Sequence, residues 1–313
     1  MTSKIILLIP YFGKFPEWSP LFFETVRRND SIDFKFYTDC DTSPYDHISN
    51  LSFQKMSFED YILLAQNAAN IDFTPDNAYK ICDLRPLFPV VHYQDIKDYD
   101  FYGWTDMDIF FGNIRNFYTE ELLHRYDVLS THSVRVSGHF ALFRNTKANR
   151  NLYKKIYNWR TQLAHPYFVG IDEHGVTNAL TMTFFDKLNE KMNWSIDNFF
   201  TRWLKKWKNK RLYLVEQYTT PFIVEPWLDG SVNSQQPNEW YYKDGVITNA
   251  RDGSRNFIYL HFMNFKSSTY RHDSSKAPWE SKSSICSASV EDMQEGITIN
   301  DQGIYKSSSE KEK

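Results

Sequence analysis

An unbroken aliphatic run at residues 5–9, ended by Pro10, constrains the fold more than any other feature of the chain. Such a run suits a strand covered on both faces, as in a parallel sheet with helices on either side. A helix start follows at Ser19-Pro20, with Ser at the N-cap and Pro at the first helical position. With a second strand at 34–38, this βαβ unit predicts an α/β protein with a mainly parallel central sheet flanked by helices.

Composition sets the broad class of the protein. With 313 residues, 42% of them hydrophobic and 17% aromatic, the chain can bury a large core in one large domain or two small ones. The net charge of −3 provides no basic field, so nucleic acid is not an expected partner. The three cysteines are few and far apart, which argues against a disulfide framework and fits a reducing compartment.

No segment has the length of a membrane span. The run at 5–9 is too short for the core of a signal peptide and far too short to cross a bilayer. We therefore expect a soluble cytoplasmic protein, with peripheral contact at the inner membrane face left open.

Further elements follow from periodicity and capping residues. A helix is expected at 57–70, where Ser57 and Asp60 resemble a capping box. The other expected helices and strands are helices at 145–163, 176–192 and 199–211, and strands at 99–105, 127–131, 139–144 and 256–262. The expected boundaries are a domain at 1–272 and a polar, mobile tail at 273–313, although Ile285, Ile297, Ile299 and Ile304 leave room for some order.

Two carboxylates, Asp106 and Asp108, follow the expected strand at 99–105. Side chains at i and i+2 of a strand share a face, so both should project the same way from its end. A hard cation such as Mn²⁺ or Mg²⁺ binds carboxylate, phosphate and water oxygens, which makes the pair a candidate nucleotide-diphosphate site. The alternative is a turn in which Asp bonds its own downstream backbone.

Several motifs, taken in order, resemble a glycosyltransferase of the GT-A type, in particular a bacterial group that assembles polysaccharides. The resemblance covers roughly residues 4–270. The motifs are Ile-Pro-Tyr-Phe-Gly at 9–13, Thr-Asp-Cys-Asp at 38–41, Ala78-Tyr79-Lys80 with Asp83 and Arg85-Pro86, and Asp106-Met107-Asp108 followed by Ile-Phe-Phe-Gly-Asn-Ile. The resemblance implies a Rossmann-like single domain. It also implies metal-dependent transfer of a sugar, from a UDP-hexose, to a hydroxyl of a glycan or lipid-linked oligosaccharide in surface polysaccharide synthesis.

In the GT-A plan, the loops after the first two strands hold the nucleoside. The residues that would lie beside the base are Pro10, Tyr11, Phe12 and Gly13. Asp39 or Asp41 would accept a hydrogen bond from the uracil or ribose. Ordinary core packing is the alternative role for the two aromatic residues.

Lys80 and Arg85 are candidate partners of the donor diphosphate, because a cation offsets its charge and Arg grips phosphate bidentately. The alternative is an internal ion pair of either residue with Asp83.

His261 and Lys266 follow the last apolar strand. Many GT-A enzymes use a late His as a third metal ligand and a nearby Lys or Arg against the leaving diphosphate, and the resemblance assigns these roles here. The spacing departs from the familiar His-x-x-Gly-x-Lys form. A core histidine with its polar atoms satisfied is the alternative.

On the acceptor side, Gly138 and His139 resemble the segment that closes over the donor sugar, and Gly138 would permit close approach of a sugar ring. Asp172 and Glu173 stand where inverting GT-A enzymes keep a catalytic acid, which would deprotonate the acceptor hydroxyl. An inverting outcome is favoured over a retaining one. The alternative for both carboxylates is a simple helix N-cap.

The basic cluster at 202–211 surrounds Trp203 and Trp207. It is either a solvated helix face or a surface that docks on anionic lipid, which would suit a lipid-linked acceptor.

Two other functions are alternatives to the transferase. A phosphohydrolase of the haloacid dehalogenase type needs its Asp-x-Asp pair after the first strand, followed by Thr or Val, whereas here Ile109-Phe110 follow a pair beyond residue 100. A catalytically inactive glycan-binding protein would fit the 20 Tyr and 9 Trp residues, which offer sugar-stacking surface. It would not need the set formed by Asp106, Asp108, His261 and Lys266.

Overall fold

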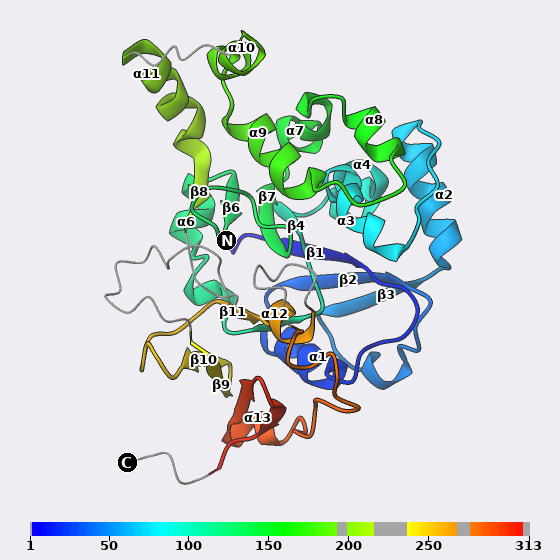
Figure 1. Cartoon of the computed structure of the whole chain (residues 1–313), viewed down its shortest axis with the longest axis vertical. Helices are drawn as coiled ribbons and strands as arrows, with labels where there is room; N and C mark the ends of the chain where they lie inside the picture. The colour runs from blue at the N-terminus through cyan, green and yellow to red at the C-terminus, as the bar shows by residue number, and fades with distance from the viewer. Residues whose placement is uncertain (1, 193–198, 216–236, 268–275, 309–313) are drawn as a thin grey trace.

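A seven-stranded sheet forms the centre of the molecule (Figure 1). The computed structural model describes residues 2–192, 199–215, 237–267 and 276–308. In spatial order the strands are β3 (Leu51–Lys55), β2 (Asp33–Thr38), β1 (Ile5–Pro10), β4 (Phe101–Thr105), β7 (Phe140–Arg144), β6 (Val128–Ser130) and β8 (Leu212–Leu214). Strand β7 runs antiparallel to both neighbours, and the other four strand pairs are parallel. The expected α/β class with a mainly parallel sheet is confirmed.

Strand β1 is buried on both faces, as its aliphatic run predicted. Ile5, Leu7 and Ile9 join one apolar cluster together with residues of α1 (Ser19–Arg28). Ile6 and Leu8 point to the other face and join a second cluster, which includes residues of α2 (Phe58–Ala69). Alternate residues of one strand thus anchor helices on opposite sides of the sheet. The remaining helices between α2 and β4 are α3 (Ile81–Leu84), α4 (Phe88–Val91) and α5 (Tyr93–Ile96).

Helices α1 and α2 start close to the residues expected from their capping patterns, and α1 is displaced by one residue. Ser57 caps α2 by accepting a hydrogen bond from the backbone N–H of Asp60, 3.0 Å away. Helix α1 begins one residue earlier than expected, because Trp18 occupies the N-cap and the Ser19 hydroxyl donates to the carbonyl of Pro16.

The expected helix at 145–163 is three short segments, α7 (Lys147–Arg150), the 3₁₀ turn η5 (Leu152–Lys155) and α8 (Trp159–Ala164). The chain leaves helical geometry at Ile156, which is extended, and Asn158 has a positive φ of 46°. The apolar positions expected to face the core are nevertheless buried, namely Leu152, Ile156, Trp159 and Leu163.

The expected helix at 176–192 divides into α9 (Val176–Thr181) and α10 (Phe184–Met192). Met182 is the C-cap of the first, and Thr183 caps the second, because its hydroxyl accepts from the backbone N–H of Asp186. Helix α11 (Phe199–Lys208) and the turn η7 (Asn209–Arg211) follow. The sequence predicts short strands and loops at 213–240, and most of that segment lies outside the described residues.

A second, antiparallel sheet contains residues that were expected to form a mobile tail. Its strands, in spatial order, are β10 (Val246–Asn249), β9 (Glu239–Lys243), β12 (Ile297–Asn300) and β13 (Gly303–Lys306), with α13 (Asp292–Glu295) beside them. The expectation of a mobile tail does not hold for residues 276–308. The reason is that Ile297, Ile299 and Ile304 bury their side chains in the main core, and β12 pairs with β9.

A two-stranded sheet joins distant parts of the chain. Strand β5 (Ile109–Phe111) pairs antiparallel with β11 (Tyr259–His261), so that His261 lies opposite Ile109. In the described part of the chain, no helix combines the length and apolar character needed to cross a bilayer.

Candidate active site

A cleft of about 540 Å³ opens where β1 and β4 end. These strands are parallel neighbours, so the loops that leave them meet at the same edge of the sheet. The residues that line the cleft include Pro10, Tyr11, Phe12, Trp18, Tyr79, Cys82, Arg85, Asp106, Met107, Asp108 and Lys266. Most of the residues expected to bind a donor therefore share one cavity.

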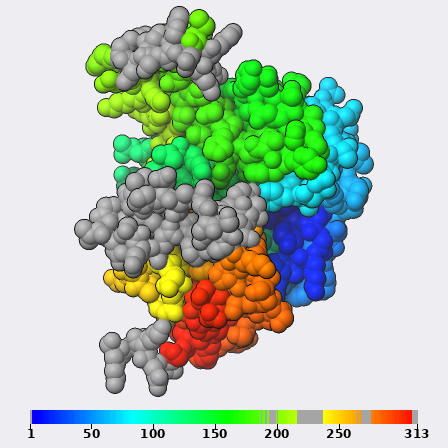
Figure 2. Space-filling model, in the orientation of Figure 1, coloured from blue at the N-terminus to red at the C-terminus, as the bar shows by residue number. Residues whose placement is uncertain are grey.

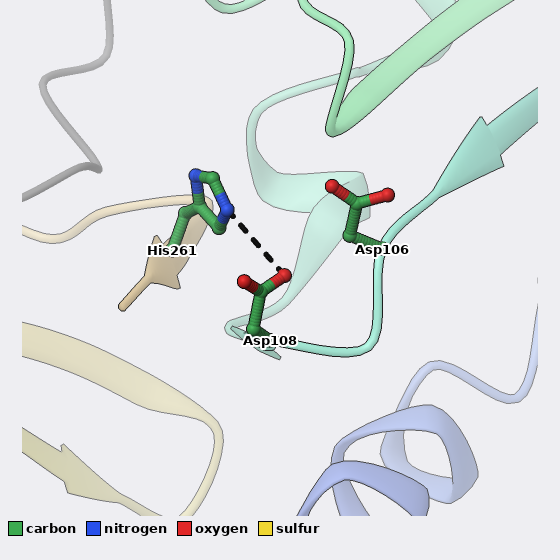
Figure 3. A group of neighbouring side chains, drawn as sticks. All are labelled: Asp106, Asp108 and His261. Carbon is green, nitrogen blue, oxygen red and sulfur yellow. Dashed lines mark ion pairs between the residues drawn. The ribbon is translucent and has the colours of Figure 1, made fainter. Parts of the chain in front are cut away.

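Asp106 and Asp108 lie in the turn between β4 and β5, and His261 is the last residue of β11 (Figure 3). The pairing of β5 with β11 brings the histidine to the acidic pair. One ligand atom from each of the three residues lies within 4.8 Å of the others. Ions such as Mn²⁺ hold their ligands at about 2.0–2.2 Å, so a spread of roughly 4 Å is what opposite ligands require. The donor set fits a divalent cation.

The two carboxylates differ in their charged neighbours. Burial works to raise the pKa of Asp108, but Lys266 and His261 hold it well below its ordinary value. Lys266 Nζ lies 2.8 Å from Oδ2, and His261 Nε2 lies 3.4 Å from Oδ1. For Asp106, burial raises the pKa against the opposing charge of Arg85, and Asp108 adds to the rise. A divalent cation would favour the ionised form of both groups.

Arg85 joins Asp106 to Asp172. Its Nη1 lies 2.7 Å from Asp172 Oδ2, and its Nη2 forms an ion pair with Asp106. Asp172 is buried, and that burial, opposed by Arg85 and reinforced by Glu173, raises its pKa to about 7. Its Oδ1 atom has no hydrogen-bond partner among the described residues. Asp172 thus contacts Arg85 and makes no N-cap bond.

Lys80 lies apart from the cleft. Its ammonium donates to Asp83 Oδ2 at 2.9 Å and to the carbonyls of Gln162 and Tyr167, each at 3.0 Å. Because three acceptors surround a fully buried ammonium group, the structure favours the internal ion pair over a role with the diphosphate. Asp83 also accepts from the backbone N–H groups of Val169 and Ile171, so this pair fixes the loop before Asp172.

Gly138 and Glu173 are in contact. The N–H of Gly138 donates to Glu173 Oε1 at 3.0 Å. A Cβ at position 138 would lie 2.9 Å from that oxygen and 3.0 Å from Asp172 Oδ2. The expected acceptor-side glycine therefore touches both expected catalytic carboxylates.

His139 packs against His261, the candidate metal ligand. Its ring stacks on that of His261 with centroids 4.1 Å apart, and its Nε2 lies 2.7 Å from the hydroxyl of Tyr259. Burial, with added repulsion from His261, holds the pKa of His139 well below its ordinary value, so the ring is neutral. His139 is buried and is not among the residues that line the cleft.

The loops after β1 and β2 are tied together. Asp39 Oδ1 accepts from the N–H of Gly13 at 2.7 Å, where Gly13 has a φ of +97° that favours glycine. Asp41 is exposed and accepts from the N–H and hydroxyl of Ser43, so it caps its own turn. Tyr11 lines the cleft, and burial raises the pKa of its hydroxyl.

Phe12 contributes both to core packing and to the wall of the cleft. Its ring packs against Phe58 and Tyr61 with centroids 5.6 and 5.5 Å away, and it also lines the cleft.

Residues 7–294 match a family of unknown function, DUF6625. The chain belongs to this family. The DUF6625 match runs from β1 to α13, so it contains Asp106, Asp108 and His261 together with the sheets that position them. A search of curated proteins finds no match.

Among solved structures, the DUF6625 chain is similar to mouse xyloside xylosyltransferase 1 in its apo form, at 7% identity over 74% of this chain and 90% of that chain, with a TM-score of 0.33. It is also similar to galactosyltransferase LgtC in complex with donor and acceptor sugar analogues, at 10% identity over 56% of this chain and 70% of that chain, with a TM-score of 0.31. The glycosyltransferase GlyE of Streptococcus pneumoniae TIGR4 shows 12% identity over 74% of this chain and 58% of that chain, with a TM-score of 0.33. At these low values, none of the three likenesses bears on what DUF6625 proteins do.

Sequence reasoning missed Trp18. Its indole N–H donates to the carbonyl of Met107 at 2.8 Å, and its ring lies 5.7 Å from the Lys266 ammonium. A single Trp before a helix has no spacing pattern, so only the fold of this DUF6625 chain places it in the cleft. Tyr259 is different, because it shares a strand face with His261 at i and i+2, a signal that the sequence did contain.

Proposed function

We propose that this chain is a metal-dependent glycosyltransferase that moves a sugar from a nucleotide donor to a hydroxyl acceptor. The observation that carries the proposal is the cluster of Asp106, Asp108 and His261, whose two carboxylates line a cleft together with Arg85 and Lys266. Two carboxylates and two cations around one cavity, with a buried imidazole beside the carboxylates, match what a nucleotide diphosphate and its metal ion require. The α/β sheet places the cleft where such folds bind ligands, at strand carboxyl ends.

Asp106, Asp108 and His261 would hold Mn²⁺ or Mg²⁺. When bound, the ion would offset the negative charge of the diphosphate as the sugar leaves it. Lys266 pairs with Asp108 and keeps about a third of its side chain exposed, at 34%. Its ammonium can therefore move from the carboxylate to a phosphate oxygen once the donor enters, since a long lysine side chain reorients at low cost.

The nucleoside would lie against the loop after β1. Pro10, Tyr11 and Phe12 line that wall of the cleft, and an aromatic ring offers a stacking face to a base. The Asp39–Gly13 hydrogen bond holds the loop in place, and Asp39 remains exposed toward solvent. A UDP-hexose is the proposed donor, and a glycan or lipid-linked oligosaccharide of surface polysaccharide synthesis is the proposed acceptor.

Asp172 and Glu173 are the proposed catalytic carboxylates. A general base works best when its pKa is close to the working pH, and the pKa of Asp172 is raised to about 7. Both carboxylates lie against Gly138, where a Cβ would come within 2.9 Å of Glu173 Oε1 and 3.0 Å of Asp172 Oδ2. Deprotonation of the acceptor hydroxyl by one of them would give attack on the anomeric carbon with inversion, the outcome we propose.

The direct test is release of UDP from a panel of UDP-hexoses with Mn²⁺ present. The proposal expects turnover of at least one donor, abolished by EDTA and by Asp108→Asn. The control is Asp98→Asn, which changes an exposed carboxylate outside the cleft and should turn over like the wild type. If no donor is turned over while the protein binds glycans on an array, the chain is a non-catalytic glycan-binding protein and the proposal is wrong.

A further inference from the structure

The chain has a basic, aromatic helix that projects from the body of the molecule. Helices α10 and α11 lie at one end, opposite the sheet of β9, β10, β12 and β13 (Figure 1). The space-filling view shows the same segment standing out at the upper left (Figure 2). A projecting helix with large apolar side chains needs an explanation, because water does not favour their exposure.

Helix α11 has an inner face that packs and anchors it. Thr201 is buried, Leu204 is half-buried, and the ammonium of Lys208 donates to the carbonyl of Met182 just after α9. Lys205 Nζ lies 3.6 Å from Asp186 Oδ1, which joins α11 to α10. Since residues 201, 204 and 208 share one side of a helix, the opposite side faces outward.

Three aromatic side chains stand on the outward side at i, i+4 and i+8. Phe199 is 85% exposed, Trp203 is 51% exposed and Trp207 is 68% exposed. An exposed aromatic stripe on an anchored helix is typical of a surface that contacts another apolar phase.

Basic residues share that outward side. Lys206 and Lys210 are exposed and form no ion pair with any residue in the described ranges. Six of the thirteen residues from 199 to 211 are Lys or Arg and none is acidic, although the whole chain has a net charge of −3. The positive charge is therefore concentrated on this segment, and it complements an anionic surface.

We infer that the outward face of α11 is a docking surface for an anionic lipid bilayer. Trp side chains are favoured at the boundary between headgroups and acyl chains, and lysine stems lie along that boundary while their ammonium groups reach the headgroups. A protein partner would need a recess shaped for three rings, whereas a bilayer accepts them without one. The inference is independent of the proposed function, because lipid binding needs neither donor nor metal.

The test is flotation of the full chain with vesicles of phosphatidylcholine alone and of an equal mixture with phosphatidylglycerol. The wild type should bind the mixed vesicles at least about tenfold more tightly than the neutral ones, and the difference should shrink at high salt. Lys206→Glu with Lys210→Glu should weaken binding to the mixed vesicles by about tenfold or more. Trp203→Ala with Trp207→Ala should weaken binding to a similar extent.

The matched control is Lys155→Glu with Tyr157→Ala, which changes an exposed lysine and an 82% exposed tyrosine elsewhere on the surface. It should bind mixed vesicles like the wild type. Thermal unfolding of each variant verifies that the fold is intact. We expect it to be intact because the changed residues are highly exposed.

Three results would overturn the inference. The first is a wild type that binds neither vesicle, and the second is equal binding to both. The third is a wild-type dimer, measured by light scattering, that becomes monomeric in the tryptophan variant without any vesicle binding, since the face would then join two copies of the chain.

Discussion

The ammonium nitrogen of Lys266 lies 2.8 Å from Oδ2 of Asp108, a candidate metal ligand. The carboxylate therefore already has a cationic partner within the chain, and a metal ion must compete with it. We expect Lys266→Met to bind Mn²⁺ alone more tightly than the wild type, and to bind UDP with Mn²⁺ about tenfold more weakly, because a charge-assisted bond to phosphate is lost. Calorimetry of both titrations measures the two effects.

Lys147→Met is the control for that experiment, because Lys147 is exposed on α7 and outside the cleft. Equal Mn²⁺ and UDP affinities in Lys266→Met and wild type would show that Lys266 has neither role.

Arg85 bridges Asp106 and Asp172. We therefore expect the effects of substitutions at Arg85 and Asp172 on the free energy of unfolding to depend strongly on each other. Arg85→Met leaves the buried carboxylate of Asp172 and the partly exposed one of Asp106 without their cation, and should lower the free energy of unfolding by about 3 kcal/mol or more. Adding Asp172→Asn removes one of those charges. The free energy of unfolding of the double variant should therefore fall by less than the sum of the two single decreases, and the difference should be about 1 kcal/mol or more. Urea unfolding at a fixed pH measures the cycle. Strictly additive losses would mean that Arg85 and Asp172 do not stabilise each other.

Asp172 predicts a pH dependence of stability with a defined sign. Its pKa in the folded chain is about 7, raised by burial, whereas an unfolded aspartate titrates near about 3.9. Between these values the folded state holds the extra proton, so the contribution of Asp172 to stability is greatest below about pH 4. It falls as the pH rises to about 7, by on the order of 4 kcal/mol. Asp172→Asn should lack this fall in urea unfolding.

His92 provides the opposite control. Burial lowers its pKa to about 3, so its contribution to stability is present above about pH 6.5 and is lost as the pH falls toward 3. His92→Gln should reduce the loss of stability in acid, whereas Asp172→Asn should reduce the loss toward neutral pH. Identical pH profiles for wild type and Asp172→Asn would contradict the raised pKa.

Gly138 tests the acceptor side without touching the donor cleft. In Gly138→Ala the new methyl group would lie within about 3 Å of Asp172 Oδ2 and Glu173 Oε1, so both carboxylates must shift. We expect UDP release to fall by about tenfold or more while UDP affinity stays unchanged, since displaced catalytic groups cost rate. Asp98→Asn is the control, because Asp98 is exposed and lies outside the cleft. A normal rate in Gly138→Ala would remove the two carboxylates from the reaction.

The sequence predicted those parts of the fold that local pattern determines. The run at 5–9 has no polar position, and β1 is buried on both faces. The strand ends at residues 10 and 105 were also predictable, which placed the loop after β1 and the acidic pair at one edge of the sheet. His261 was placed with them through the family resemblance, and β5–β11 pairing brings it there.

Partners far apart in the chain were not predictable. Asp83 is two residues from Arg85 and was the alternative partner considered for it, yet Arg85 pairs with Asp172, 87 residues away. Spacing along the chain describes neighbours within one element, whereas this contact depends on how two loops pack. The strands β12 and β13 were not predicted for a similar reason. Their few apolar residues lie among polar ones, and the strands are defined by pairing with each other and with β9, which is distant in the sequence.

Calorimetric titration of UDP in the presence of Mn²⁺ tests the central claim most directly, with wild type, Asp108→Asn and the exposed control Asp98→Asn. The account predicts metal-dependent UDP binding by wild type and Asp98→Asn, lost in Asp108→Asn although its thermal unfolding shows a folded protein. Absence of binding by the wild type, for UDP and then for GDP, or equal binding with EDTA, would contradict the assignment of Asp106, Asp108 and His261 to a nucleotide-metal site.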